Sequence, residues 1–179
     1  MRVIAGEFRH RLLKSVPGLD TRPTPDRMRE ALFNILAPRI EGASFADLYA
    51  GTGAVGIEAL SRGARSVLFV EADRAAVGVI RQNLKTLGIP LGIDARADVR
   101  QGKAGLLAAK LDADFVFLDP PYGLEREYGV VLGLLGERAP GLVIVQHDIR
   151  TKLEPSYGAL EHQRLLRQGD NCLSFFAPA

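Results

Sequence analysis

An acid, two prolines and a tyrosine directly follow an apolar run near the middle of the chain. The run is Phe-Val-Phe-Leu at 115–118, and the residues after it are Asp119, Pro120, Pro121 and Tyr122. An exocyclic amine of a nucleobase is a poor nucleophile because its lone pair is delocalised into the ring. Two fixed acceptors can take its N–H bonds and direct the nitrogen toward a methyl sulfonium. This stretch is therefore a candidate site for orienting such an amine, if a binding site for the methyl donor lies beside it.

Each residue of this stretch has an expected role. The carboxylate of Asp119 and the carbonyl of Pro120 are the two acceptors. Pro121 fixes its own φ angle and biases Pro120 toward extended geometry, so that this carbonyl is held still. Tyr122 offers a ring face on which an unstacked base can lie. The alternative interpretation is a turn that ends a strand and buries its tyrosine.

A second stretch has the glycine spacing of a nucleotide-binding loop. Residues 47–60, DLYAGTGAVGIEAL, carry the pattern G-x-G-x-x-G between an expected strand and an expected helix. Glycines let the backbone approach a ligand, and a helix N-terminus presents free N–H groups. The alternative is a tight turn without a ligand. The residues that we assign to cofactor binding here are Asp47, Gly51, Thr52, Gly53 and Gly56.

Two further acids complete the expected cofactor site. Glu71 ends a second strand about 20 residues after the glycines, where an acid commonly binds ribose hydroxyls. Asp98 is expected after a third strand, where an acid often meets the adenine of S-adenosylmethionine. The alternatives are a solvated strand end for Glu71 and a helix cap for Asp98.

A glycine loop with a ribose-binding acid suits both NAD and S-adenosylmethionine. An NAD enzyme would usually need a second half-domain or a substrate domain, for which 179 residues leave little room. Its acid/base residue is also missing from any recognisable position. These observations favour S-adenosylmethionine as the cofactor.

Strands and helices that alternate from residue 45 onward must position these motifs. The sequence predicts strands at 45–49, 66–71, 91–95, 115–118, 142–146, 159–167 and 172–176, and helices at 54–62, 74–87, 101–110 and 124–136. This alternation is typical of an α/β fold with a doubly wound, mostly parallel sheet, here of seven strands with an antiparallel final strand. Ligands bind such sheets at the carboxyl ends of strands near the switch in strand order. We therefore expect the glycine loop and Asp119 to share one crevice.

The first 44 residues break this rhythm and concentrate basic charge. The sequence predicts a hairpin at 2–18 and then a helix within 21–36, capped by Thr24 or Asp26. Residues 1–39 hold eight Lys and Arg against four acids, a local charge of +4 in a chain of net charge +2. Such asymmetry suggests contact with a polyanion, although a solvated basic surface is the alternative. We expect one domain, 1–179, with 1–44 as an extension of the catalytic core 45–179.

Composition argues against several other classes of protein. The single cysteine, Cys172, allows no disulfide within the chain and no thiolate metal cage. The histidines, His10, His147 and His162, lack the spacing of a local metal motif, so no metal is expected. No apolar run reaches the ~20 residues of a membrane span, and basic residues interrupt any signal-peptide core. We expect a cytoplasmic protein.

The motifs together resemble the amino-methylating class of S-adenosylmethionine-dependent methyltransferases, whose hallmark is Asn/Asp/Ser-Pro-Pro-aromatic. Longer blocks look like the RsmD family, and these are RVIAGEFRHRLL, TRPTPDRMREALFNIL, DLYAGTGAVGIEALSRGA, VLFVEAD and VFLDPPYG. Enzymes of that family methylate the N2 amine of a guanine in 16S ribosomal RNA of the small subunit. The sequence departs from the family pattern at two places. Gln146 precedes His147 where the family usually has Val-Glu-His, and Gln168 precedes Gly169 where it usually has Tyr-Gly.

The resemblance implies a role for each of the motifs. Gly51, Gly53 and Glu71 would hold S-adenosylmethionine, and residues 119–122 would hold the guanine amine. The partner would be ribosomal RNA or a small-subunit assembly intermediate, and we expect a monomer. His147 is expected to be structural. The expected substrate-binding residues are Arg9, Arg11 and Lys14 at phosphates, and Arg22, Thr24 and Arg27 at the mouth between cofactor and base.

Three other functions stay open from the sequence alone. The first is an amino-methyltransferase for an adenine or cytosine of DNA or of another RNA. The second is a nonenzymatic RNA-binding assembly factor with a vestigial cofactor site. The third is an NAD oxidoreductase. In the basic segment, Arg22 and Arg27 could also simply pair with local acids.

Overall fold

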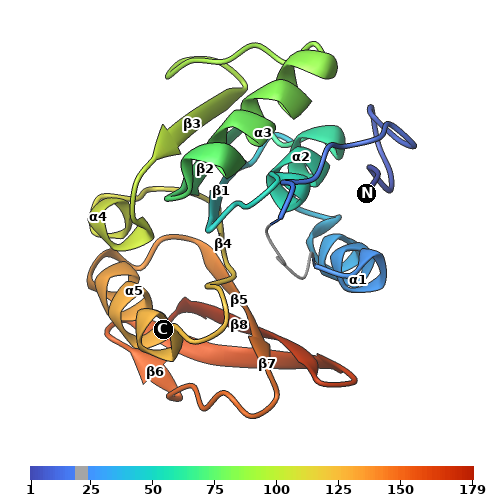
Figure 1. Ribbon diagram of the computed structural model, residues 1–179. Helices are drawn as coiled ribbons and strands as arrows, with labels where there is room; N and C mark the ends of the chain where they lie inside the picture. Colours follow the sequence, from blue (N-terminus) through green and yellow to red (C-terminus); the bar gives the residue numbers. More distant parts are fainter. Residues whose placement is uncertain (19–23) are drawn as a thin grey trace.

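The computed structural model describes residues 1–18 and 24–179, and strands from this part of the chain form one eight-stranded sheet (Figure 1). The strand order is β3-β2-β1-β4-β5-β8-β7-β6. The strands are β1 Ser44–Leu48, β2 Ser66–Glu71, β3 Ala97–Gln101, β4 Phe115–Leu118, β5 Leu142–Asp148, β6 Ser156–Tyr157, β7 Leu160–Gln168 and β8 Asn171–Pro178. Strands β1 to β5 pair in parallel, and β8 runs antiparallel between β5 and β7. The predicted fold class is confirmed.

The sheet has one strand more than the seven expected. The additional β6 is only two residues long and pairs antiparallel with the start of β7, Tyr157 opposite Leu160. Gly158, with a φ of 57°, makes the tight turn between them. A two-residue strand has no alternation that could reveal it in a sequence. As a result β6 and β8, and not the final strand alone, run against the other strands.

Helices cover both faces of the sheet (Figure 1). They are α1 Asp26–Leu36, α2 Ala54–Ser61, α3 Arg74–Thr86, α4 Ala104–Ala108 and α5 Glu125–Arg138. Helices α1, α2 and α3 share one apolar core with one sheet face, around Phe33, Phe45 and Phe69. Helices α4 and α5 pack on the other face, around Val116 and Leu132. The strands between these layers are almost continuously buried, as in other doubly covered parallel sheets.

The prediction of a strand at 91–95 is wrong. The third strand is 97–101, and Leu91 makes only an isolated bridge to Ala97. The apolar residues that suggested the earlier strand are exposed, with Ile93 80% accessible. Strand β3 lies at the sheet edge and is half polar, so it lacks the apolar run of a central strand. The helix predicted at 101–110 is shorter, Ala104–Ala108, and begins later because β3 continues through Gln101.

The expected cap of α1 is also wrong. Pro25 occupies the N-cap position and no side chain caps the helix. The Asp26 carboxylate instead accepts a hydrogen bond of 3.0 Å from the guanidinium of Arg29. Thr24 is buried. Arg29 is fully buried, and a buried guanidinium without a negative partner is strongly unfavourable. The Asp26 carboxylate therefore pairs with Arg29 and does not cap the helix.

The N-terminal segment doubles back on itself, as the predicted hairpin requires, although Arg2 and Leu12 form only one isolated bridge. The segment docks on the C-terminal end of α2. There the Phe8 N–H donates to Ser61 Oγ at 2.9 Å and the Glu7 N–H donates to the Ser61 carbonyl at 2.7 Å. A Cβ on Gly6 would lie 1.8 Å from that carbonyl, so the contact needs glycine. Leu12 remains 77% exposed on the outer side of the segment.

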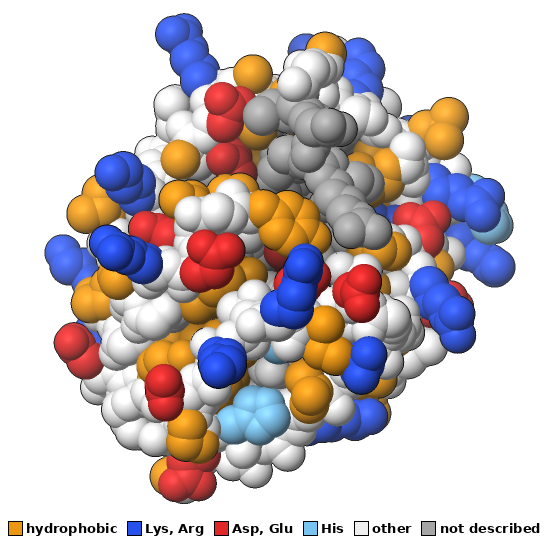
Figure 2. Space-filling view, turned by 60° about the horizontal axis from the view of Figure 1, so that its bottom comes forward, with side chains coloured by type: hydrophobic (Ala, Val, Ile, Leu, Met, Phe, Trp, Pro, Cys, Tyr) orange, Lys and Arg blue, Asp and Glu red, His pale blue; other side chains and the backbone are white. Residues whose placement is uncertain are grey.

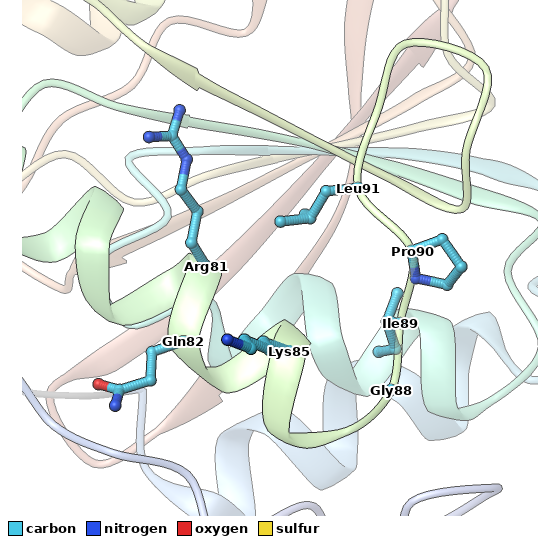
Figure 3. Close-up of a pocket in the computed structure, with 7 residues that line it drawn as sticks. All are labelled: Arg81, Gln82, Lys85, Gly88, Ile89, Pro90 and Leu91. Carbon is cyan, nitrogen blue, oxygen red and sulfur yellow. The ribbon is translucent and has the colours of Figure 1, made fainter.

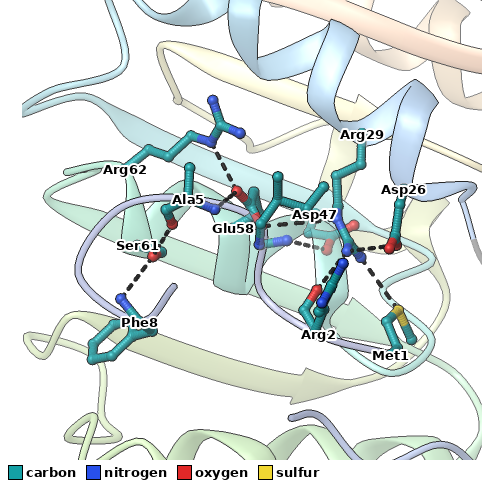
Figure 4. Close-up of polar contacts among 12 residues, drawn as sticks. Met1, Arg2, Ala5, Phe8, Asp26, Arg29, Asp47, Glu58, Ser61 and Arg62 are labelled. Atoms are coloured by element: carbon teal, nitrogen blue, oxygen red, sulfur yellow. Dashed lines mark hydrogen bonds and ion pairs between the residues drawn. The ribbon is translucent and has the colours of Figure 1, made fainter. Parts of the chain in front are cut away.

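A buried ionic cluster ties this segment to two helices (Figure 4). The Glu58 carboxylate of α2 accepts the N–H groups of Ile4 and Ala5 at 2.9 and 3.0 Å and pairs with Arg62 at 2.8 Å. Arg29 of α1 lies 3.8 Å from the same carboxylate and donates to the Arg2 carbonyl at 2.7 Å. Burial lowers the pKa of Arg29, while the charges of Glu58 and Asp26 raise it. One carboxylate thus connects the extension, α1 and α2.

Candidate active site

The sheet topology brings the two sequence motifs to one edge. Strands β1 and β4 pair in register, Leu48 beside Leu118, and the next residues are the glycine loop and Asp119. The switch in strand order lies between these two strands, because β2 lies beyond β1 and β5 lies beyond β4. The predicted common crevice is therefore where an α/β sheet binds ligands.

The three glycines of the loop have two different structural reasons. Gly51 and Gly53 have φ angles of 56° and 80°, which favour glycine, and Gly53 is the N-cap of α2. A Cβ on Gly56 would lie 2.3 Å from the ring of Phe69, so this glycine lets α2 pack closely on β2. A Cβ on Gly51 would meet nothing within 4 Å. The loop thus leaves space for a ligand at Gly51, whereas at Gly56 the helix α2 is packed tightly against β2.

Asp47 supports the loop from inside the sheet. It is 1% exposed, and its Oδ2 accepts the Gly56 N–H at 2.9 Å. Burial raises the pKa of Asp47 to about 8, the hydrogen bond from Gly56 lowers it, and the charges of Asp119 and Glu71 raise it further. Asp47 therefore fixes the first turn of α2 beneath the place where we expected it to touch a cofactor.

Glu71 lies at the end of β2 and holds the loop from its side. Its Oε2 accepts the Gly51 N–H at 2.8 Å, and its Oε1 accepts the Asp73 N–H at 2.9 Å. Each carboxylate oxygen has a second lone pair, so two ribose hydroxyls can still donate to this group. Glu71 is half-buried beside the open loop, which is the position that sequence reasoning expected.

The predicted position of Asp98 is wrong. It lies within β3 opposite Leu68, three residues before the strand ends, and pairs with Arg100 at 2.8 Å. It does not cap α4 either, because the N-cap there is Lys103. The residue of β3 level with Glu71 is Gln101. Sequence reasoning missed Gln101 because the strand was placed six residues too early.

Asn83 is a second residue that sequence reasoning missed. Its Nδ2 donates to the Thr52 carbonyl at 3.1 Å and to the Lys14 carbonyl at 3.2 Å, and its Oδ1 accepts the Lys14 N–H at 2.8 Å. This side chain is 2% exposed and joins the glycine loop to the N-terminal segment. The available signal was an amide next to Leu84 and three residues after Ile80, on the apolar face of α3.

Asp119 is half-buried at the end of β4. Burial raises the pKa of its carboxyl to about 7. Gln146 Nε2 on the neighbouring strand donates to Asp119 Oδ2 at 3.3 Å. Pro120 is buried, whereas Tyr122 is 68% exposed, which argues against a turn that merely buries its tyrosine.

A hollow of about 180 Å³ opens beside the Tyr122 ring. Its lining residues are Pro121, Tyr122, Gly123, Glu125, Tyr128, Asp148, Arg150 and Thr151. This volume is below the roughly 300–1,000 Å³ of a typical small-molecule site, so it suits a part of a nucleotide. The exposed ring at its rim can stack on a base that has left its helix.

Tyr49 links the glycine loop to the helix after the Asp-Pro-Pro-Tyr stretch. Its φ of 66° is unusual for an aromatic residue, and its hydroxyl donates to Glu127 of α5 at 2.5 Å. Burial and the adjacent Glu127 carboxylate raise the pKa of Tyr49. The two halves of the candidate site are thus connected by one side-chain hydrogen bond.

The expected substrate-binding residues lie in different surroundings. The side chains of Arg9, Lys14 and Arg27 are exposed, and Thr24 is buried. Arg11 Nη2 donates to the Thr86 carbonyl at the end of α3, at 3.1 Å. Among the described members of this set, Lys14 is the one whose backbone is tied through Asn83 to the glycine loop. Arg22 lies outside the described residues.

Charge on the face in Figure 2 is mixed. Lys and Arg side chains are spread over this face and alternate with acidic ones, which agrees with the small net charge of the chain.

A larger hollow of about 560 Å³ lies between the end of α3 and residues 88–91 (Figure 3). Its lining includes none of the predicted catalytic or cofactor residues, so we do not place the reaction there.

His147 lies on β5, beside the antiparallel strand β8. The ring of His147 is buried, with Nε2 2.8 Å from Ser174 Oγ and Nδ1 2.9 Å from the Asp148 carbonyl. Burial lowers its pKa. In the described part of the chain, no three His, Cys, Asp or Glu side chains are grouped so that they could hold a metal ion. The helices described here include none long and apolar enough to cross a membrane.

Comparisons with known proteins find relatives over nearly the whole chain. A family described as Conserved hypothetical protein 95 matches residues 1–177. The ribosomal RNA small subunit methyltransferase D of Escherichia coli K12 is 37% identical over 176 residues, which are 94% of this chain and 86% of that protein. A Bacillus subtilis protein described as a candidate rRNA methyltransferase, YlbH, is 38% identical over 166 residues, 89% of each chain.

Solved structures share the whole fold. The Escherichia coli protein yhhF, described as a candidate methyltransferase, superposes with a TM-score of 0.83 at 33% identity and covers 99% of this chain and 97% of its own. A candidate methylase from Haemophilus influenzae has a TM-score of 0.80 at 28% identity and covers 99% and 98%. Both similarities include the N-terminal extension as well as the sheet.

Proposed function

Because this chain belongs to the RsmD family of ribosomal RNA methyltransferases, we propose that it methylates the N2 amine of a guanine in small-subunit ribosomal RNA, with S-adenosylmethionine as the methyl donor. The observation that carries the proposal is the placement of Asp119. Its half-buried carboxylate follows β4 at the same sheet edge as the glycine loop, and the chain continues from it into the buried Pro120 and the exposed Tyr122.

The residues around the glycine loop fit S-adenosylmethionine. Glu71 can accept hydrogen bonds from both ribose hydroxyls. A Cβ on Gly51 would meet nothing within 4 Å, so there is room for the cofactor beside this residue. When bound, this cofactor supplies an electrophilic methyl group on sulfur. Two side chains hold the loop in shape: Asp47 accepts the Gly56 N–H, and Asn83 donates to the Thr52 carbonyl.

Asp119 and Pro120 then orient the nucleophile. The Asp119 carboxylate and the Pro120 carbonyl each accept one N–H of the base amine, which directs the nitrogen lone pair at the methyl carbon. The bound cofactor would supply the methyl group, and the methylated nitrogen would then lose one proton to Asp119 or to solvent. The carboxyl pKa of about 7 leaves Asp119 mainly ionised at pH 8, so that it can accept these hydrogen bonds.

The N-terminal extension is the part of the domain that we assign to RNA. The exposed Arg9, Lys14 and Arg27 side chains can contact phosphates, which positions RNA without reading its sequence. Lys14 has the most direct link to catalysis, because its backbone shares Asn83 with the glycine loop. Tyr122 would stack on the target base at the rim of the neighbouring hollow.

Transfer of labelled methyl groups tests the proposal. The protein is incubated with labelled S-adenosylmethionine and either naked small-subunit rRNA or assembled small subunits, and the modified nucleoside is identified by mass spectrometry. We expect N2-methylguanosine as the product. Methylated adenosine or cytidine would move the target to another base, and a protein that binds no cofactor would be a nonenzymatic RNA-binding factor.

Substitution Asp119→Ala tests the role of the carboxylate in the same assay. We expect methyl transfer to fall at least ~1,000-fold, because an orienting acceptor and a proton acceptor are lost together. Affinity for S-adenosylmethionine, measured by calorimetry, should change less than about threefold. Full activity of this variant would contradict the proposed mechanism.

A further inference from the structure

Gln146 lies beside the proposed catalytic carboxylate. Strands β4 and β5 pair Leu118 with Val145, so Asp119 and Gln146 are the next residues on adjacent strands. The Gln146 side chain is 7% exposed, and its Nε2 donates to Asp119 Oδ2 at 3.3 Å. Within residues 1–18 and 24–179, this is the one side-chain hydrogen bond that reaches the Asp119 carboxyl.

The position of Gln146 is fixed by contacts on both sides. Its strand β5 lies between β4 and β8, where Gln146 pairs with Leu173. Its own carbonyl accepts a hydrogen bond of 3.0 Å from the buried Tyr128 hydroxyl of α5. The amide therefore approaches Asp119 from a rigid part of the sheet and not from a mobile loop.

The other end of the amide has no partner. Gln146 Oε1 is buried and accepts no hydrogen bond from any described residue. A buried polar atom without a partner is unfavourable, and the two preceding residues of the strand, Ile144 and Val145, are apolar. A glutamine at this position is therefore poorly explained by packing, and its one hydrogen bond points to a role at Asp119.

We propose that Gln146 is a positioning residue for Asp119: its amide holds Oδ2, favours the ionised carboxylate, and leaves Oδ1 as the acceptor for the amine of the base. This inference rests on the proposed function. An ionised carboxylate can only accept hydrogen bonds, so the amide must present its N–H₂ group to it. Once Oδ2 accepts this hydrogen bond, rotation of the carboxylate is restricted, and Oδ1 is left to accept the amine.

Other groups around Asp119 act in the opposite direction. Burial raises the pKa of Asp119, and the charge of Asp119 in turn helps to raise the pKa of the buried Asp47 on β1. Tyr128 on α5 stays neutral in the ordinary assay range, because burial raises its pKa. Gln146 is thus a donor that opposes the effect of burial on Asp119 without adding a charge of its own.

Substitution Gln146→Met removes the donor and keeps the approximate size of the side chain. The pH dependence of kcat/KM for methyl transfer to small-subunit rRNA should shift upward by about one pH unit. Activity at pH 7 should then fall about fivefold, because the ionised fraction of Asp119 falls from about one half to about one tenth, and it should approach the wild-type value above pH 9. Ser174→Ala on β8 is the matched control, since it removes a buried hydroxyl that bonds to His147 and should leave the profile in place.

A carbon NMR titration of the Asp119 carboxyl in the protein without RNA gives a readout independent of catalysis. We expect its pKa to rise in Gln146→Met. Gln146→Glu keeps the shape and places a second carboxyl there, so the pair should share a proton and titrate in two separated steps. An Asp119 titration that is unchanged in both variants overturns the inference. If wild-type protein methylates no RNA, the proposed function fails, while this titration still decides whether Gln146 controls Asp119.

Discussion

The Asp119 carboxyl holds a proton up to a pH of about 7 because burial disfavours its charged form. An unfolded chain releases that proton near pH 4, so between pH 4 and 7 the folded state binds more protons. The free energy of unfolding must therefore fall as the pH rises through this window and then level off. A group that burial destabilises in this way at neutral pH is more typical of a functional site than of a structural one.

Substitution Asp119→Asn should make the protein more stable at neutral pH. Asparagine has no charge to desolvate, so we expect the free energy of unfolding to increase by about 1–3 kcal/mol at pH 8 and to change little at pH 4. Urea unfolding of both proteins at the two pH values measures the difference. A gain that is larger at pH 4 than at pH 8 would show that the sign of this linkage is wrong.

At the scale of single residues, local chemistry could be predicted better than position. The expected surroundings of Glu71 and Asp119 follow from a strand end and a motif, and both residues lie at the expected edge. Asn83 and Gln146 act through partners 31 and 27 residues away, which no local pattern reveals. The predicted position of Asp98 was wrong because it depended on where the edge strand β3 ends.

Asn83 joins two elements, the glycine loop and the N-terminal segment, and its replacement tests that connection. In Asn83→Ala the Thr52 carbonyl and the Lys14 backbone groups lose their buried partner, which costs about 1–3 kcal/mol in the free energy of the ordered loop. We expect S-adenosylmethionine to bind roughly 5- to 100-fold more weakly by calorimetry. Gln82→Ala, on the exposed side of the same helix, is the control and should bind normally.

The cluster around Glu58 holds a whole element in place. In Glu58→Gln the fully buried Arg29 loses a compensating charge, so we expect the free energy of unfolding to fall by about 3 kcal/mol or more. Thermal or denaturant unfolding measures this, with Glu30→Gln on the exposed face of α1 as the control. If the two variants are equally stable, the cluster does not fasten the extension to the core.

Elements in the middle of the sheet could be predicted almost to the residue. The strands at 66–71 and 115–118 are found where the sequence placed them, because continuous apolar runs mark buried parallel strands. The edges were harder, since β3 is half polar and β6 has two residues. The docking of the N-terminal segment on α2 also depends on contacts between residues more than 50 positions apart.

At the scale of the whole molecule, one sheet edge collects the parts that methyl transfer to an RNA base requires. The strand order places the glycine loop beside Asp119, Tyr49 bridges the two through Glu127, and Asn83 connects the loop to the basic extension. Relatives that share the whole fold include the extension as well. We therefore expect RNA to contact both the extension and the Tyr122 side of the crevice.

The most direct test of this account is the nucleoside composition of small-subunit rRNA from cells that lack the protein. We predict that one N2-methylguanosine is missing, that it returns with the wild-type chain, and that it does not return with Asp119→Ala expressed at the same level. If the full set of N2-methylguanosines persists without the protein, or is restored by Asp119→Ala, the assignment of the reaction to this site is contradicted.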